Sequence, residues 1–183
     1  MREYEFTLKF RLPDVDADPE PLLEALADVG CTDALAGIGQ PGRIALDFTR
    51  EADSAFAAIT SALRDIQRAI PGAQLVEASP DFVGLTDIAE IAGFSRQNMR
   101  KLMLGNPATF PPAIHEGNPS LWHLASVLAW LRDQQRPVDE ALLEVAEVVM
   151  GLNLARTTIF LRDNERIVLG FDAFLVRSRS GSG

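Results

Sequence analysis

Residues 84–103 read GLTDIAEIAGFSRQNMRKLM, and this stretch predicts two short helices joined by a tight turn. Thr86 is a candidate N-cap for the first helix, because a hydroxyl oxygen there can accept a hydrogen bond from a free backbone N–H. Gly93 suits the end of that helix, because glycine adopts a positive φ without steric cost. Ser95 is the matching candidate cap for the second helix. The stretch therefore predicts a compact helix pair that crosses closely at the small residue Ala89.

The two sides of this helix pair differ in polarity. The positions expected to face inward are apolar: Ile88, Ala92, Phe94, Met99 and Leu102. Between residues 95 and 104 the outward side carries three positive charges and no negative one. A helix that reads the major groove needs such side chains, since arginine pairs with guanine, glutamine or asparagine with adenine, and basic residues with phosphates. The DNA-contacting residues predicted for the pair are Thr86, Ser95, Arg96, Gln97, Asn98, Arg100 and Lys101.

The net negative charge of the whole chain argues against DNA binding, but this charge is distributed unevenly along the sequence. The 183 residues carry a formal net charge of -9, whereas a basic patch or stripe is typical of nucleic-acid-binding proteins. Residues 1–81 hold 15 acidic and 7 basic side chains, while residues 82–136 hold 4 and 5. The second helix of the pair is therefore a local basic footprint on an acidic chain.

The first eighty residues predict a separate α/β unit. Apolar residues alternate with polar ones at the start, which is typical of a strand with one buried face: Tyr4, Phe6, Leu8, Phe10 and Leu12. One helix is predicted after Asp18-Pro19 and another after Ser54, with a β-hairpin between them that turns at residues 40–42. The expected buried stripes of these helices are Leu22, Leu23, Leu26, Ala27 and Val29, and Phe56, Ile59, Leu63, Ile66 and Ile70. With a final strand AQLVEA, the order β-α-β-β-α-β predicts a ferredoxin-like unit.

Downstream of the helix pair, residues 106–122 read NPATFPPAIHEGNPSLW and predict a small hairpin that turns at residues 116–119. Trp122 and Trp130 are interpreted as core residues, because a tryptophan buries a large apolar area. Between them begins a third helix with apolar residues spaced by three and four: Leu124, Val127, Leu128 and Leu131. Residues 138–161 are helical in pattern but apolar on more than one face, which predicts burial against the same chain or pairing with another subunit. The final RSRSGSG predicts a flexible tail.

LTDIAEIAGFSRQNMRKL followed by TFPPAIHEGNPSLWHLASVLAWL resembles the winged helix-turn-helix of the MerR superfamily, especially its AlpA-like and excisionase-like members. The resemblance covers residues 83–133 and places Arg100 where the family has a phosphate-contacting arginine. It implies that the hairpin is a DNA-binding wing. The wings of this family often carry basic residues, whereas here the polar residues are Glu116, Asn118 and Ser120. The wing contacts implied are therefore His115, Asn118 and backbone amides.

Several other classes of site lack the residues they need. Cys31 is the only cysteine and can form neither an intramolecular disulfide nor a multi-cysteine metal site, so it is interpreted as a small buried side chain. His115 and His123 have no third ligand or orienting carboxylate at a recognisable spacing. No glycine-rich phosphate loop follows a strand. We therefore expect no enzymatic activity, no metal and no cofactor. The absence of a signal peptide or membrane-spanning run predicts a cytoplasmic protein.

Together these patterns predict an α+β protein with a ferredoxin-like unit at 1–80, a winged helix-turn-helix at 82–136 and a dimerisation helix with a flexible tail at 137–183. The predicted function is sequence-specific binding of double-stranded DNA by a bacterial transcriptional regulator, a homodimer through residues 138–161. The acidic N-terminal unit is a candidate sensor or partner-binding domain. The alternative is a protein-interaction module, antitoxin-like or an adaptor, that binds its partner through this acidic unit. A small-molecule-binding enzyme on the same unit is less favoured, because no reactive cluster is present in it.

Overall fold

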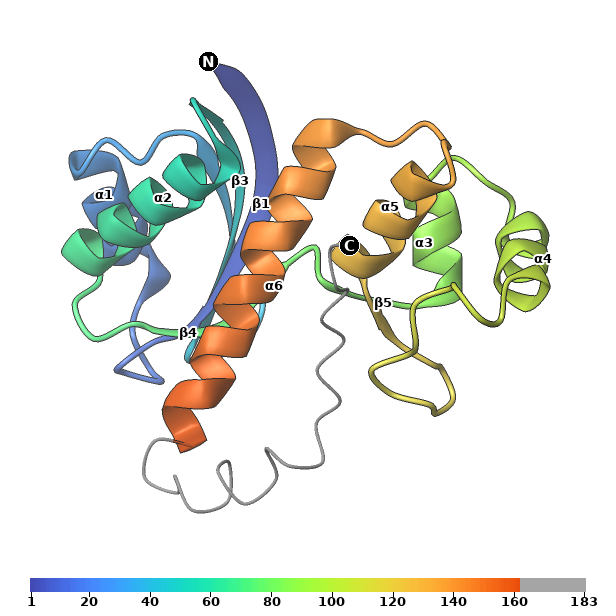
Figure 1. Ribbon diagram of the computed structural model, residues 1–183. Coiled ribbons are helices and arrows are strands. Elements are labelled where there is room, and N and C mark those ends of the chain that lie inside the picture. Colours follow the sequence, from blue (N-terminus) through green and yellow to red (C-terminus); the bar gives the residue numbers. More distant parts are fainter. Residues whose placement is uncertain (162–183) are drawn as a thin grey trace.

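The computed structural model describes residues 1–161, which form an α+β fold with an antiparallel sheet and six helices (Figure 1). The predicted tail lies outside the described residues. The first part contains β1 (Arg2–Arg11), α1 (Pro19–Asp28), β2 (Ala34–Gly37), β3 (Arg43–Ala52), α2 (Ala55–Ala69) and β4 (Gln74–Ser79). The second part contains β5 (Phe82–Val83), α3 (Leu85–Ile91), α4 (Arg96–Gly105), β6 (Trp122–His123), α5 (Leu124–Asp133) and α6 (Glu140–Leu161).

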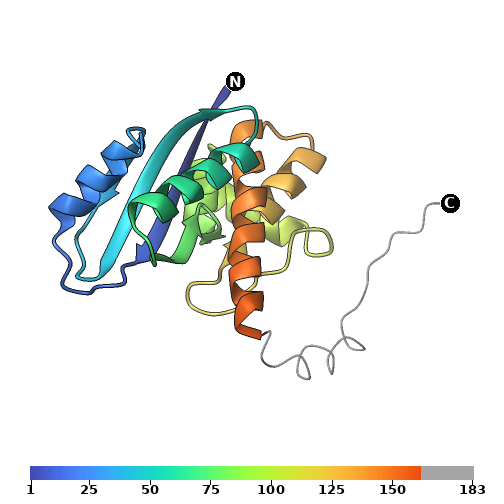
Figure 2. The same cartoon turned by 90° about the vertical axis from the view of Figure 1, so that its left-hand side faces the viewer.

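The first four strands form one antiparallel sheet in the order β2-β3-β1-β4. Helices α1 and α2 cover one of its faces, as the two views at right angles show (Figures 1 and 2). Both helices begin at the predicted caps, because the side chain of Asp18 accepts the Glu20 N–H and that of Ser54 accepts the Ala57 N–H. The order β-α-β-β-α-β expected from the sequence is therefore present in residues 1–80.

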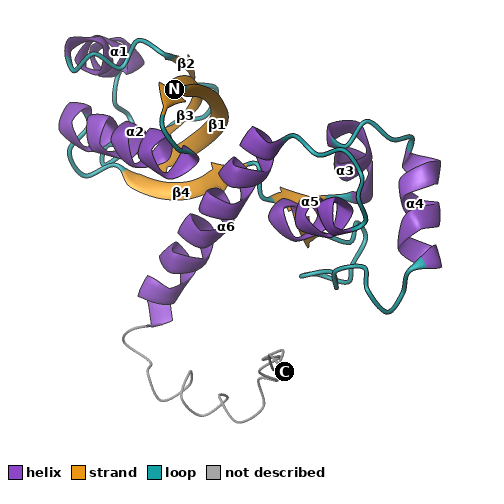
Figure 3. Cartoon of the chain, turned by 45° about the horizontal axis from the view of Figure 1, so that its top comes forward, coloured by secondary structure: helices purple, strands orange, loops and turns teal. Residues whose placement is uncertain are grey.

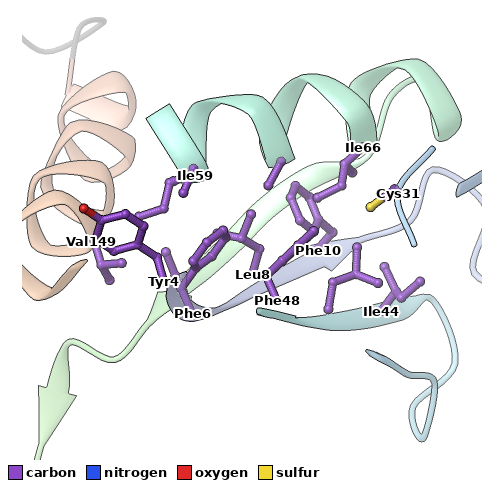
Figure 4. Close-up of a cluster of buried hydrophobic side chains, with 14 of the residues drawn as sticks. Tyr4, Phe6, Leu8, Phe10, Cys31, Ile44, Phe48, Ile59, Ile66 and Val149 are labelled. Carbon is purple, nitrogen blue, oxygen red and sulfur yellow. The ribbon is translucent and has the colours of Figure 1, made fainter. Parts of the chain in front are cut away.

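The core of this first part lies between the sheet and the two helices, and Figure 4 shows the side chains of β1 and β3 meeting those of α2. The alternating residues of β1 are buried as predicted, and Phe6 stacks on Phe48 of β3 with ring centroids 5.0 Å apart. Burying such a side chain contributes roughly 1.5–3 kcal/mol. The predicted stripes are wrong at three positions, since Leu23, Ala27 and Phe56 are exposed. Their helices rest on the sheet by a narrower apolar face than the sequence suggests.

One charged residue, Arg50 of β3, occupies a core-facing position in line with Ile44, Leu46 and Phe48. Its guanidinium donates to both carboxylate oxygens of Asp33, at 2.6 and 2.8 Å. It also donates to Asp65 and Ser61 of α2, each at 2.9 Å, and lies 5.1 Å from the centroid of the Phe48 ring. A buried guanidinium costs free energy unless its donors are satisfied, and here they connect β3, α2 and the loop before β2.

Helices α3, α4 and α5 enclose a second core with the short sheet β5-β6. Ile88, Ala89 and Met99 are buried in it, and so are the four predicted residues of α5. Trp122 and Trp130 are buried as predicted. Their indole N–H groups donate to Pro111 O and Thr109 Oγ1, and Phe110 packs edge-on against both rings. These aromatic contacts fix the segment after α4 onto α5.

Helix α6 lies between the two cores (Figure 3). Val145 and Val149 belong to the first core, whereas Leu143 and Ala146 belong to the second. The sequence predicted either burial against the same chain or pairing with another subunit, and burial against the same chain is confirmed for these positions. These buried residues of α6 are not available for a contact between two copies of the chain. Only the exposed residues of the helix could form such a contact. No helix within residues 1–161 has the length and apolar character needed to cross a membrane.

A buried polar junction connects α6 to both parts of the chain. The side-chain amide of Asn153 accepts the Ala78 N–H at 3.0 Å and donates to Ala78 O at 2.8 Å, so it pairs with the backbone of β4. It also donates to Asp81 Oδ2 at 2.8 Å, and Asp81 Oδ1 lies 2.6 Å from His123 Nδ1. The Asp81 carbonyl oxygen accepts the Leu124 N–H at the start of α5. Asp81 thus joins the end of the first part to α5 through its carbonyl oxygen and to His123 and α6 through its carboxylate.

Candidate nucleic-acid interface

The N-cap of α3 lies two residues before the predicted cap, Thr86. This N-cap is Gly84, whose N–H donates to the carboxylate of Asp87 at 2.8 Å. Thr86 therefore lies within the first turn, and the prediction that it caps the helix is wrong. The reason is that Asp87 can reach back to the backbone of Gly84, which makes a side chain at the cap unnecessary. Thr86 remains exposed at the N-terminal end of α3.

The turn between α3 and α4 has the predicted glycine geometry. Gly93 adopts a φ of +70°, and Phe94 N donates to Ala89 O at 2.7 Å. A Cβ added at Gly93 would meet no atom within 4 Å, so the requirement for glycine is conformational and not steric. The turn sends the chain directly into α4, whose N-cap is Ser95 as predicted, with its Oγ 3.2 Å from Asn98 N.

Helix α4 separates its apolar and polar residues as the sequence predicts. Met99 is fully buried against α3 and α5, and Leu102 and Met103 are partly buried beside it. The polar side chains all lie exposed on the other side: Ser95, Arg96, Gln97, Asn98, Arg100 and Lys101. Among residues 1–161, no carboxylate forms an ion pair with the three cationic side chains of this helix. Their charge is therefore available to an external anion.

Two open concavities meet at α4. The first, of about 500 Å³, is lined by Ser95, Gln97, Asn98, Arg100, Lys101 and Leu104. The second, of about 460 Å³, lies between α4, the start of α3 and the loop at 117–122. Its lining includes Thr86, Arg96, Arg100 and Asn118, so the structure brings these four predicted residues to one place and puts Arg100 in both concavities.

The hairpin predicted after α4 closes at His115 and Leu121. Ile114 N donates to Leu121 O at 2.9 Å and Leu121 N to His115 O at 3.0 Å. Residues 115–121, called the hairpin loop below, carry Asn118 into the second concavity. His115 is exposed at the base of this loop and lines neither concavity. Of the two predicted loop contacts, only Asn118 is thus grouped with the helix residues.

The sequence did not single out Leu104, which is 62% exposed at the end of α4 and lines the first concavity beside Lys101. Its helical spacing from Arg100 is the signal that could have identified it. Asp87 also lines the second concavity, and its carboxylate already accepts the Gly84 N–H. Within the described residues, no group of three His, Cys, Asp or Glu side chains is placed to hold a metal ion.

Comparisons of this chain with protein-family models, with curated proteins and with solved structures found no match.

Proposed function

We propose that this protein binds double-stranded DNA sequence-specifically and acts as a bacterial transcriptional regulator. In this proposal α3 and α4 are a helix-turn-helix, the hairpin loop is its wing, and residues 1–80 are a ferredoxin-like unit. The observation that carries the proposal is the polar face of α4, which presents Arg96, Arg100 and Lys101 without carboxylate partners among residues 1–161. The proposal requires no catalytic step, metal or cofactor.

The dimensions of α4 suit a recognition helix. A helix with its side chains is about 10–12 Å across and fits the major groove of B-DNA, which is about 12 Å wide, and the ten residues of α4 extend over about 15 Å. We assign Arg96 and Gln97 to base edges. They lie at the N-terminal end of α4, and in helix-turn-helix proteins the N-terminal residues of the recognition helix contact the bases. Arg100 and Lys101 are assigned to phosphates. Thr86, Asn98 and Asn118 flank these residues and are assigned to the adjoining backbone, together with Ser95 and His115.

The acidic remainder of the chain contributes to selectivity. Residues 1–81 hold 15 acidic and 7 basic side chains, so their field repels a polyanion. Non-specific binding of proteins to DNA is mostly electrostatic, and this repulsion restricts the approach to α4. The same acidic unit remains our candidate for the binding of a protein partner or an effector.

We further propose that two copies act together, because a single α4 offers few contacts and two half-sites multiply their effect. Exposed residues of α6 recur at spacings of four and three on one side of the helix: Glu147, Gly151, Leu154 and Thr158. Leu154 is 51% exposed, and a Cβ at Gly151 would meet nothing within 4 Å. This face, and not the buried residues of 138–161, is the proposed contact between copies.

The proposal is tested by measuring binding to a pool of genomic fragments, and then to the selected fragment, by fluorescence anisotropy over a series of salt concentrations. We expect the parent to select a sequence, and Arg96→Ala and Arg100→Ala each to bind it about tenfold or more weakly, since a good arginine contact is worth about 1–3 kcal/mol. The loss of one phosphate contact at Arg100 should also reduce the slope of log K against log salt by about 0.9.

Arg136→Ala is the matched control, because Arg136 is an exposed arginine after α5 and lines neither concavity. Its affinity and salt slope should equal those of the parent. A parent that selects no sequence even at low salt, or α4 variants that bind as well as the Arg136 control, would refute the proposed function.

A further inference from the structure

A second groove with charged residues is formed by elements other than α4. It lies where the end of β1 and the starts of β3 and β4 meet the C-terminal half of α6. Its volume is about 620 Å³. Three arginines line it, together with Gln74 and a set of apolar side chains. The arginines come from three elements, β1, β3 and α6, and are Arg11, Arg43 and Arg156. The apolar lining is supplied by Leu75, Val76, Leu152 and Ala155.

The three arginines are not held together by acidic partners. Arg11 and Arg43 are directly paired across β1 and β3, and like charges at opposed positions of an antiparallel pair destabilise it. Among residues 1–161, neither they nor Arg156 forms an ion pair, and no carboxylate lines the groove. Arg11 bonds only to the neutral side chain of Gln74. This cationic cluster lies in a part of the chain whose charge is otherwise acidic, which makes it a candidate site for an anion.

The nearest acidic side chain on β4 is engaged elsewhere. Glu77 Oε1 accepts hydrogen bonds from Lys9 Nζ at 3.1 Å and from Ser79 Oγ at 2.8 Å. Glu77 is not part of the groove lining. Arg156 is one of the positive charges that lower the pKa of Glu77, but within residues 1–161 no carboxylate lines the groove itself.

The apolar half of the groove defines the rest of the ligand. Leu152 and Arg156 are four residues apart and so share one side of α6, while Leu75 belongs to β4 beside the arginine of β1. Apolar and cationic groups thus lie next to one another on both walls. Pockets for small molecules span about 300–1,000 Å³ and combine an apolar lining with few polar groups, and this groove has that size and composition.

We propose that this groove binds a small organic carboxylate with an apolar body. The carboxylate pairs with the guanidinium groups of Arg43 and Arg156, with Arg11 beside them, and the apolar body covers Leu75, Val76 and Leu152. Such a ligand contacts the sheet and α6 at once and relieves the repulsion between Arg11 and Arg43. Because it binds only the folded chain, it stabilises the packing of α6 on the sheet. This site is independent of DNA binding.

The test uses octanoate as the probe, with acetate, 1-octanol and inorganic phosphate as partial probes that supply the charge or the apolar body alone. Binding is measured by isothermal titration calorimetry and by the melting temperature of the full chain. We expect octanoate to bind saturably and to raise the melting temperature, and the three partial probes to have little effect. Arg43→Ala and Arg156→Ala should each weaken octanoate binding about tenfold, the factor that corresponds to loss of one charge-assisted hydrogen bond.

Arg68→Ala is the control, since Arg68 is an exposed arginine of α2 that does not line the groove. It should bind octanoate as the parent does. Circular dichroism of each variant before titration separates loss of binding from loss of fold, and Arg43→Lys provides a milder change at the same position. Absence of saturable binding, equal binding of 1-octanol or phosphate, or equal binding by the arginine variants would overturn the proposal.

Discussion

At the residue scale, the Arg50 network shows a charge placed at a core position and satisfied on every side. The hydrogen bonds that Arg50 donates, opposed in part by burial, hold the pKa of the Asp33 carboxyl below its ordinary value. The same hydrogen bonds, which the Asp33 carboxylate accepts, raise the pKa of Arg50, although the burial of Arg50 acts in the opposite direction. The pair is therefore ionised at neutral pH.

The stability of the fold should depend on pH through Asp33. Because its folded pKa lies below its unfolded value, the carboxylate stabilises the fold above about pH 4. That contribution is lost as the pH falls through the folded pKa. We expect Asp33→Asn to lower the free energy of unfolding by roughly 1–3 kcal/mol at pH 7, since Arg50 keeps Asp65 and Ser61 but loses its two bonds to a charged partner. At low pH the difference between variant and parent should become small.

Urea denaturation at pH 7 and at several acidic values measures this dependence. Glu51→Gln is the matched change from acid to amide, at the exposed neighbour of Arg50 on the same strand, and should leave stability nearly unchanged. A deficit for Asp33→Asn that stays constant from neutral to acidic pH would contradict the assigned role of the carboxylate.

Individual residues differ in how far the sequence could predict them. Ser95 and Gly93 were predictable because a cap and a positive-φ turn depend on a few adjacent residues. The prediction for Thr86 was wrong because Gly84 is the N-cap instead. The carboxylate of Asp87 accepts the Gly84 N–H and so stabilises this earlier start of the helix. Arg50 continues the phase of the buried residues of β3, which indicates burial, but its carboxylate partners lie 15 and 17 residues away and follow only from the packing of α2 and β2.

At the element scale, α6 shows where a hydrophobic pattern stops being informative. An apolar pattern on more than one face predicts that the helix is covered, but the pattern holds no information on which surface covers it. The structure divides the helix between two cores, and a single polar residue, Asn153, fixes its register against β4. Edge strands expose unpaired backbone groups, and the Asn153 amide satisfies one donor and one acceptor of β4.

Asn153→Leu should therefore destabilise the protein far more than its size suggests. It leaves the Ala78 N–H and C=O and one oxygen of Asp81 without a partner in a buried place, and each such group costs about 1–3 kcal/mol. With three such groups, we expect a total loss of at least roughly 3 kcal/mol in urea denaturation, with faster hydrogen exchange of the Ala78 amide.

The control for this change is Thr157→Val, one turn further along α6, where the hydroxyl bonds only to the carbonyl of Asn153. It should cost less than about 1 kcal/mol, the usual worth of such a bond at an exposed residue. Equal losses for the two variants would show that Asn153 contributes only packing.

At the scale of the whole molecule, the predictable part was the order of the elements and the unpredictable part was how they meet. Alternation and helical spacing gave the strands of residues 1–80 and the three helices after them, because each pattern lies within a few residues. The junction of Asp81, His123 and Asn153 joins residues up to 72 positions apart. Nothing in the local pattern of any one of them indicates the other two.

The same difference between local pattern and long-range packing determines which parts of the candidate site could be predicted. The exposed face of α4 followed from its sequence, because burial of Met99 fixes the orientation of the other side chains. The grouping of Thr86, Arg96 and Asn118 depends on the placement of the hairpin loop beside α3 and α4. The three-arginine groove also depends on packing, because its residues are ordinary exposed charges in the sequence and only the contact of α6 with the sheet gathers them.

The proposed dimer is a property of the whole molecule, and the exposed face of α6 allows it to be tested. If the exposed face of α6 joins two copies, Leu154→Glu replaces its one large apolar side chain with a carboxylate in each copy, and burial of an unpaired charge in the contact is strongly unfavourable. Light scattering after size exclusion should show a dimer for the parent and a monomer for the variant. The affinity for the selected DNA should fall by at least about tenfold, because one half-site is lost and each 1.4 kcal/mol of contact is a factor of ten.

Leu35→Glu supplies the comparison, since Leu35 on β2 is 74% exposed and lies outside the proposed contact. That variant should keep both the dimer and the affinity, which excludes a general effect of added negative charge on a chain that already carries -9. A parent that is monomeric yet selects a DNA sequence would reject the α6 contact and keep the role of α4. A dimer that persists in Leu154→Glu would place the contact between copies on another surface.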